Sequence, residues 1–196
     1  MNATTDDEVR AFEGKNRWAT GICLDDGAVQ PYYDCPESDC IQVKFPETPR
    51  RAAYFARMLS TLNLEGEEYF EGGLLWLTLW TIGSPQLEKV GWNLVEKMRL
   101  AFGETRPIGV APGHWFRSDE FVELNAFLLP CFLFGWDAIF FPSGQDYFVH
   151  ISHDEYWTVV AKTKAIYDSL FQQLHPLAPE KAHPNIVACF CRARSF

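Results

Sequence analysis

Residues 72–83, GGLLWLTLWTIG, are apolar at almost every position and begin and end with glycine. The run is shorter than the roughly 20 apolar residues that a membrane-spanning helix needs. Continuous apolar runs of this kind are typical of strands that are covered on both faces. We therefore expect this stretch to form a strand at the centre of a β-sheet.

A strand and a helix are predicted upstream of this central strand. The sequence CIQVKF at residues 40–45 alternates between apolar and polar residues with the period of a strand. Thr48 followed by Pro49 is typical of a helix start, with threonine as the N-cap and proline in the first turn. The apolar face of this helix is predicted at Ala52, Phe55, Leu59 and Leu62.

A second helix is predicted downstream, because Ser84 and Pro85 repeat the same capping signal and Gly103 is a typical helix stop. Its apolar stripe is predicted at Leu87, Val90, Leu94, Met98 and Ala101. A third helix is expected after the cap and acidic first turn at residues 118–120, and it should end or bend near Pro130.

The other segments predict further strands. Residues 18–33 and 136–151 each contain two strand-like runs around a turn sequence, DDG and PSGQD, and both are expected to form hairpins. IGVAPGHWF at 108–116 and NIVACFC at 185–191 are each expected to hold one more strand. This order predicts an α+β fold with a mixed sheet of about five to seven strands and about four helices, in which crossovers join parallel strands.

The domain organisation follows from length and composition. A chain of 196 residues with 47% hydrophobic content is large enough for one packed core. Residues 1–14 are polar and acidic, so we expect a flexible N-terminus, with residues 15–196 forming a single globular domain.

The sequence VHISHDEYW at residues 149–157 concentrates titratable side chains at a predicted strand end. Ser152 followed by Glu155 matches a capping box, so the interpretation that we favour is a helix that begins at this point and continues to residue 174. His150 should share a strand face with Phe148, and His153 should open the helix.

The alternative interpretation of this segment is catalytic. His150, His153, Asp154 and Glu155 could form a metal-dependent, hydrolase-like site, with a carboxylate as base and a histidine as metal ligand or proton carrier. His114 could assist. The spacing lacks the helical H-E-x-x-H pattern, and the six cysteines lack C-x-x-C pairs, so neither a metal nor another cofactor is predicted.

A second candidate site lies in APGHWF, where Pro112 and Gly113 precede His114 and Trp115. Ligands often bind beyond strand ends, so these two residues could line a small-ligand pocket between helix and sheet. A tight turn in which the histidine packs against the tryptophan is the structural alternative, and it is the one that we favour.

Charge and aromatic content favour an interaction protein. The formal net charge of −9 opposes nucleic-acid binding and favours a basic protein partner, although Arg50, Arg51 and Arg57 form a small basic group. The 15% of aromatic residues could supply a binding surface. With no secretory signal or membrane helix in the sequence, the expectation is a cytoplasmic, non-enzymatic binding domain, with the hydrolase and the small-ligand protein as alternatives.

Overall fold

The computed structural model describes residues 1–5, 7–9, 11, 20–22, 29–31, 40–44, 48–62, 72–77, 89–144, 146–152 and 156–174. The strands are β1 (Asn2–Thr4), β2 (Thr20–Ile22), β3 (Val29–Pro31), β4 (Cys40–Lys44), β5 (Gly72–Leu77), β6 (Gly113–Arg117), β7 (Ala138–Pro142), β8 (Tyr147–Ser152) and β9 (Tyr156–Ala161). The four longer helices within these residues are α2 (Pro49–Thr61), α4 (Lys89–Ala101), α5 (Phe121–Phe134) and α6 (Lys164–Leu174).

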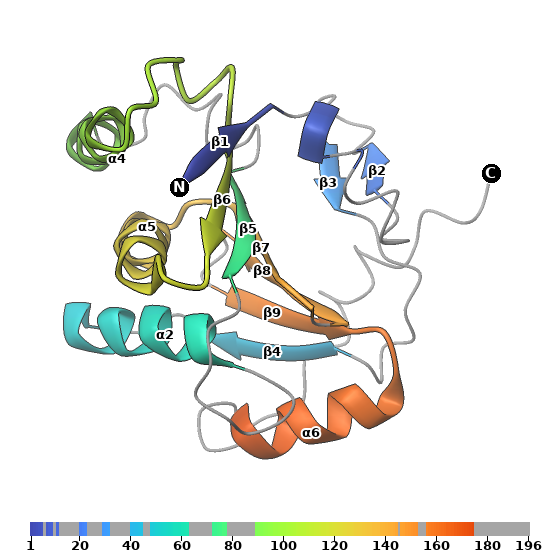
Figure 1. The fold of residues 1–196 in the computed structure, drawn as a ribbon. Helices are drawn as coiled ribbons and strands as arrows, with labels where there is room; N and C mark the ends of the chain where they lie inside the picture. The colour runs from blue at the N-terminus through green and yellow to red at the C-terminus, as the bar shows by residue number, and fades with distance from the viewer. Residues whose placement is uncertain are drawn as a thin grey trace.

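Seven strands form one sheet in the order β1-β6-β5-β7-β8-β9-β4, and β2 pairs with β3 in a separate two-stranded sheet (Figure 1). The predicted α+β class, strand number and helix number are confirmed. Every strand pair within the described residues is antiparallel, so parallel neighbours expected from the crossovers are not found there. The reason is that β5 lies between β6 and β7, which run in the same direction and are joined through α5.

The predicted central strand forms β5, and both its faces are buried. Leu75 and Leu77 belong to the larger hydrophobic core, whereas Leu74 and Trp76 belong to a second core on the other face of the sheet. The alternation of side chains along a strand produces this division. Residues 78–83, the rest of the predicted strand, lie outside the described residues.

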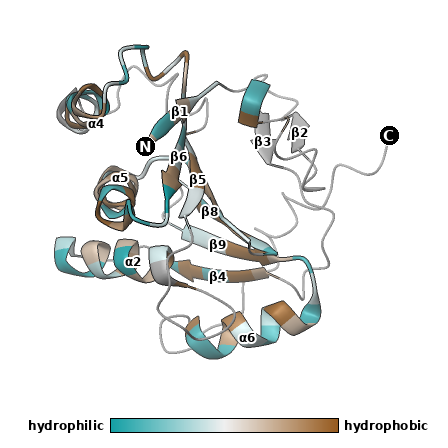
Figure 2. Cartoon of the chain, in the orientation of Figure 1, coloured by the Kyte–Doolittle hydropathy of each residue, from teal (hydrophilic) through white to brown (hydrophobic). Residues whose placement is uncertain are grey.

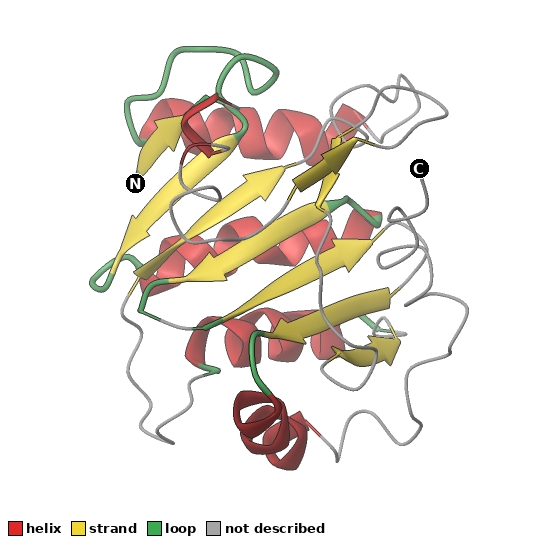
Figure 3. Cartoon of the chain, turned by 90° about the vertical axis from the view of Figure 1, so that its right-hand side faces the viewer, coloured by secondary structure: helices red, strands yellow, loops and turns green. Residues whose placement is uncertain are grey.

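Helices α2, α5 and α4 cover the face of the sheet that carries the larger core, with α5 between the other two (Figures 1 and 3). The N-cap of α2 is Thr48, whose side chain accepts a hydrogen bond from the backbone N–H of Arg51 at 3.3 Å, and this confirms the predicted helix start. Its predicted apolar face is buried throughout. Helix α5 continues through Pro130 and ends at Gly135, whose φ of 60° lies in the left-handed region.

The apolar stripe predicted for α4 is wrong in its orientation. Leu94 and Ala101 are exposed, and the buried face of the helix carries Gly91, Val95 and Arg99 instead. A methyl group on Gly91 would lie 2.5 Å from the ring of Phe134, so the helix packs closely against α5 at this glycine.

The helix predicted to begin at Ser152 is also wrong, because β8 ends at Ser152 and β9 begins at Tyr156. The two strands form a hairpin in which Ser152 pairs with Tyr156. The sequence of β9, YWTVVA, is aromatic and β-branched, which favours a strand. The final helix, α6, begins only at Lys164 and buries Leu170 and Leu174.

The N-terminal segment is partly anchored, where fraying was expected. Asn2–Thr4 form edge strand β1, which pairs with β6, and the carbonyl of Ala3 accepts a hydrogen bond from Nη2 of Arg106 at 3.0 Å. Val9 is fully buried in the second core. Met1 packs against the larger core, so backbone pairing and two apolar contacts stabilise a segment whose sequence is otherwise polar.

The two predicted hairpins are found, whereas the predicted strand in the tail cannot be compared with the structure. The hairpin of β2 and β3 and the hairpin of β7 and β8 are confirmed, with Gly144 at a φ of 70° between the second pair. The tail strand predicted at 185–191 lies outside the described residues. Within the described residues, no helix is long and apolar enough to cross a bilayer.

Candidate functional site

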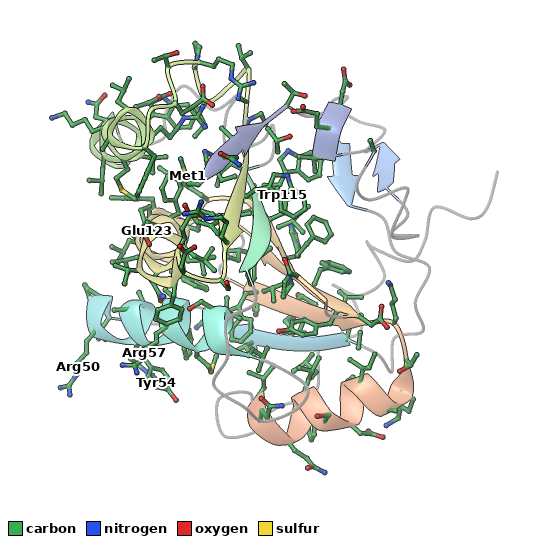
Figure 4. All side chains as sticks on the ribbon, viewed as in Figure 1. Met1, Arg50, Tyr54, Arg57, Trp115 and Glu123 are labelled. Carbon is green, nitrogen blue, oxygen red and sulfur yellow. The ribbon has the colours of Figure 1, made fainter. Side chains whose placement is uncertain are left out.

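His114 lies in β6 and is fully buried on the face of the sheet that the helices cover. Its ring lies 4.9 Å, centroid to centroid, from the ring of Phe127 in α5. Trp115 is the next residue along the strand and therefore projects to the opposite face, where it packs against the second core (Figure 4). The predicted pair of binding residues is divided between the two faces of the sheet.

The partner of His114 is Arg99, a fully buried arginine near the C-terminal end of α4. Nη1 of Arg99 contacts Nε2 of His114 at 2.5 Å and donates a hydrogen bond to the carbonyl of Ala111 at 2.7 Å. Nη2 donates to the carbonyl of Arg106 at 2.9 Å. One guanidinium therefore joins the end of α4, the connection to β6, and β6 itself.

Glutamates balance the charge of this buried group. Nε of Arg99 lies 3.7 Å from Oε2 of Glu96, and Oε1 of Glu96 accepts a hydrogen bond from the backbone N–H of Ile108 at 3.1 Å. Glu104 forms an ion pair with Arg106 at 2.7 Å, and hydrogen bonds from Arg106 lower the pKa of Glu104 to about 2. The carboxylates thus lie around the guanidinium and brace the connection between α4 and β6.

Burial, and after it the positive charge of Arg99, lowers the pKa of His114 to about 3. The histidine is therefore neutral near pH 7, and its Nε2 is the acceptor toward Arg99. The ring is covered, and its Nε2 is engaged with Arg99, so this nitrogen is not open to a substrate in solution. What this arrangement can do is hold the connection between α4 and β6 against the sheet.

His150 lies in the middle of β8, on the face that carries the second core. It shares that face with Phe148, as the alternation predicted, and it pairs with Ile139 of β7 and Thr158 of β9. Thr158 in turn pairs with Gln42 of β4, and these three polar residues are all buried. They form a polar row across three adjacent strands.

The histidines of the two candidate sites are not brought together. His114 faces the helices and His150 faces the other side of the sheet, and strands β5 and β7 separate β6 from β8. His153, Asp154 and Glu155 lie outside the described residues. In the part of the chain that the structure describes, no three histidine, cysteine or acidic side chains lie together so that they could hold a metal ion.

The thiol of Cys131 is fully buried in α5, and burial raises its pKa to about 12. Cys40 is also buried. Cys131 is therefore an unreactive core side chain, since nucleophilic cysteines need a stabilised thiolate and access to substrate.

The outer surface of the helices shows a feature that the sequence interpretation missed. Seven large hydrophobic side chains are exposed within the described residues, and all of them come from α2, α4 with the connection after it, and α5. We call this set the helix-layer surface: Tyr54, Leu94, Leu100, Phe102, Val110, Val122 and Leu133. None comes from α6 or from the sheet.

The signal for this surface is present in the sequence of α5, FVELNAFLLPCFLF, which is apolar on nearly every side of the helix. Val122, Ala126, Leu129 and Leu133 recur at helical spacing on its outer side, and Val122 is 73% exposed. An amphipathic helix would carry polar residues there. The sequence also indicated the buried position of Arg99, because Arg99 follows Val95 by four residues and so lies on the same buried face of α4.

Helix α2 also carries a basic stripe. Arg50, Tyr54 and Arg57 are exposed and project together on one side of the helix, below its ribbon in Figure 4. Figure 2 shows the hydrophilic turns of α2 beside the more hydrophobic strand β4.

Comparisons of the chain with protein-family models, with curated proteins and with solved structures find no match.

Proposed function

We propose that this chain is a protein-interaction domain that binds its partner through the helix-layer surface. The observation that carries the proposal is the location of the exposed hydrophobic side chains, all of which lie on one layer of the molecule. Exposed apolar residues that are scattered singly need no explanation, but a concentration on one face is typical of a binding site.

The outer side of α5 is the centre of this surface. Along α5, the stripe from Val122 to Leu133 extends for about 16 Å, since each helical residue adds about 1.5 Å. The two flanking helices also carry exposed hydrophobic side chains, Tyr54 on α2 and Leu94 on α4. A cluster of exposed aliphatic side chains along one side of a helix is typical of the apolar core of protein–protein interfaces.

Helix α6 provides an internal comparison. It buries Leu170 and Leu174, and its exposed positions carry polar or small residues such as Lys164, Asp168 and Gln172. This is the usual pattern of a helix that has one face in water. Helix α6 follows this pattern and α5 does not, so exposed apolar side chains are not a general property of the helices in this protein.

Site-specific photocrosslinking tests the proposal. A photoreactive phenylalanine analogue is placed at Val122 and, as the matched control, at Asp168 of α6, which is also exposed. We expect the Val122 probe to crosslink one discrete protein in cells that express the chain, and the Asp168 probe to yield no such product.

A substitution provides the second arm of this test. Val122→Asp should change the free energy of unfolding by less than about 0.5 kcal/mol, because the side chain is exposed. The same substitution should abolish the crosslink from a probe placed at Leu133. Equal crosslinking from Val122 and Asp168, or a crosslink that survives Val122→Asp, would contradict the proposal.

A further inference from the structure

We infer that Arg106 blocks the edge of the seven-stranded sheet at β1, where this strand would otherwise pair with β1 of a second copy of the chain. The inference is independent of the helix-layer surface, because it concerns the backbone of an edge strand. Its evidence is the direction of the backbone groups of Ala3 and the contacts that Arg106 makes.

Strand β1 is the last strand at one border of the sheet. It pairs with β6 and with no further strand of the described residues. Edge strands present backbone N–H and C=O groups that can pair with a strand of another molecule. The sequence of β1, NAT, carries no charge that would oppose such pairing. Its edge is therefore open to self-association unless another part of the chain covers it.

The backbone of Ala3 points away from the sheet. On β5, the N–H of Leu77 donates to the carbonyl of Pro112 at 3.2 Å, so Leu77 directs its backbone groups toward β6. Leu75 lies two residues earlier, points the same way and pairs with His114. The backbone groups of His114 are thus directed toward β5, and Ala3, which lies opposite His114 on β1, directs its own N–H and C=O outward.

Arg106 occupies this outward carbonyl. Its Nη2 donates a hydrogen bond to the oxygen of Ala3 at 3.0 Å. Arg106 belongs to the connection between α4 and β6, which passes beside β1 (Figures 1 and 3). A charged side chain on the outer side of an edge strand is one of the usual means by which proteins prevent edge-to-edge pairing.

The guanidinium of Arg106 is held in place by Glu104. Nε and Nη2 of Arg106 donate to the two carboxylate oxygens at 2.9 and 2.7 Å, and the backbone N–H of Arg106 donates to the same carboxylate at 2.7 Å. The carbonyl of Arg106 accepts a hydrogen bond from Arg99 at 2.9 Å. These hydrogen bonds fix the side chain over the edge before any partner strand arrives.

The residues that follow β1 have local hydrogen-bond partners. The N–H of Thr5 donates to Glu8 at 2.8 Å, and the carbonyl of Thr5 accepts from the N–H of Val9 at 3.0 Å. Thr5 and Glu8 form a capping box for the helical turn at residues 7–9. The carbonyl of Ala3, in contrast, is covered by a residue from a distant part of the chain. Removal of the Arg106 side chain should therefore uncover the edge and leave the local structure after β1 in place.

A second copy of β1 fits this edge. Two β1 strands that run antiparallel about a two-fold axis beside Ala3 would exchange N–H···O=C hydrogen bonds between the two Ala3 residues. The contact uses the same strand on both molecules, so it closes as a dimer. Its acceptor is the carbonyl that Arg106 occupies. Arg106 and a second β1 thus compete for one oxygen and for the space beside it.

Sedimentation velocity at a series of protein concentrations tests the inference. We compare the unmodified chain with Arg106→Ala and, as the matched control, with Lys162→Ala, which also removes a cation paired with a carboxylate at 2.7 Å. We expect Arg106→Ala to lower the dimer dissociation constant by at least about tenfold, because both copies lose a competing hydrogen bond. The control should stay within about twofold of the unmodified chain.

Two further variants locate the contact. Ala3→Pro removes the outward N–H without removing a hydrogen bond to β6, so in the Arg106→Ala background it should restore the dissociation constant of the unmodified chain. Glu104→Gln removes the charge that holds Arg106 in place, and it should promote association by a smaller factor than Arg106→Ala. Far-UV circular dichroism checks that each variant keeps its fold.

Two results would overturn the inference. One is an Arg106→Ala variant that associates no more than Lys162→Ala, and the other is association that Ala3→Pro fails to reverse. If Arg106→Ala does not fold, Glu104→Gln with and without Ala3→Pro decides by the same criteria. None of these substitutions lies on the helix-layer surface, so the outcome is separate from that of the Val122 crosslink.

Discussion

Acidification from about pH 7 to about pH 5 should destabilise the fold, because the unfolded chain binds a proton on His114 that the folded protein excludes. The ring is fully buried, and its Nε2 lies 2.5 Å from Nη1 of Arg99. A proton on this nitrogen would place a second positive charge against a buried guanidinium. The neutral form is therefore strongly preferred in the folded state, and the pKa of His114 falls to about 3.

The sign and size of the effect follow from linkage. The pKa of His114 is lower in the folded state than in the unfolded state, where it is about 6.5, so the unfolded chain binds the proton first. Stability from the neutral ring is fully present above about pH 6.5 and is lost progressively as the pH falls toward about 3. At about pH 5 the loss is about 2 kcal/mol, since each pH unit below 6.5 costs about 1.4 kcal/mol.

Urea unfolding at a series of pH values, followed by circular dichroism, measures this loss. The comparison is with His114→Gln, whose amide oxygen can still accept a hydrogen bond from Arg99 but does not titrate. We expect this variant to lose about 2 kcal/mol less than the unmodified chain between about pH 7 and pH 5.

Glu104→Gln serves as a control, because the pKa of Glu104 is about 2 and its titration lies below this pH range. It should leave the pH dependence between about pH 5 and pH 7 unchanged. If His114→Gln shows the same pH dependence as the unmodified chain, His114 is not held neutral by its surroundings, and the electrostatic account of the buried pair is wrong.

Three further predictions concern the core. Arg99→Met should reduce the free energy of unfolding by about 3–5 kcal/mol in urea titrations, because the carbonyl of Ala111 and the ring of His114 lose their buried donor; a loss below about 1 kcal/mol would contradict this. Gly73→Ala should cost about 1–3 kcal/mol in the same assay, since an added methyl group would lie 2.6 Å from the ring of Phe140, and a neutral result would refute the close packing. Cys131 should resist alkylation until the chain unfolds, as peptide-resolved mass spectrometry can follow, and rapid labelling of the folded protein would show that its burial is incomplete.

Local signals in the sequence predicted much of the fold, because several elements are specified within a few residues. Thr48 and Pro49 predicted the start of α2, and the capping hydrogen bond is present. The continuous apolar run of β5 predicted a strand that is covered on both faces. In each case the residues that determine the element lie within it or directly beside it.

The helix predicted over the segment from Ser152 to Ala161 was wrong because the sequence there fits both a helix and a strand. Ser152 and Glu155 match a capping box, and Tyr156, Val159 and Val160 fit a helical stripe as well as a strand. The β-branched and aromatic residues of β9 pair with both β8 and β4, and these long-range partners are not visible in the segment itself. The orientation of α4 was missed for a related reason, since a buried arginine interrupts its apolar face.

The candidate site was predictable only in part. Strand alternation placed His150 correctly with Phe148, but it could not show that His114 faces the helices while His150 faces the other side of the sheet. The binding partner of His114 comes from a helix 15 residues earlier in the chain, and only the tertiary fold brings the two together. The helix-layer surface could have been anticipated from the apolar sequence of α5.

The two edge strands have a consequence for how the protein is made. Each pairs with a strand more than a hundred residues away, Asn2 of β1 opposite Trp115 and Cys40 of β4 opposite Val160. During synthesis, β1 and β4 cannot pair until β6 and β9 have been translated. Contacts between residues so far apart in the sequence slow folding. A nascent chain halted before residue 156 would present β4 without the strand beside it, and chaperones would be expected to recognise that intermediate.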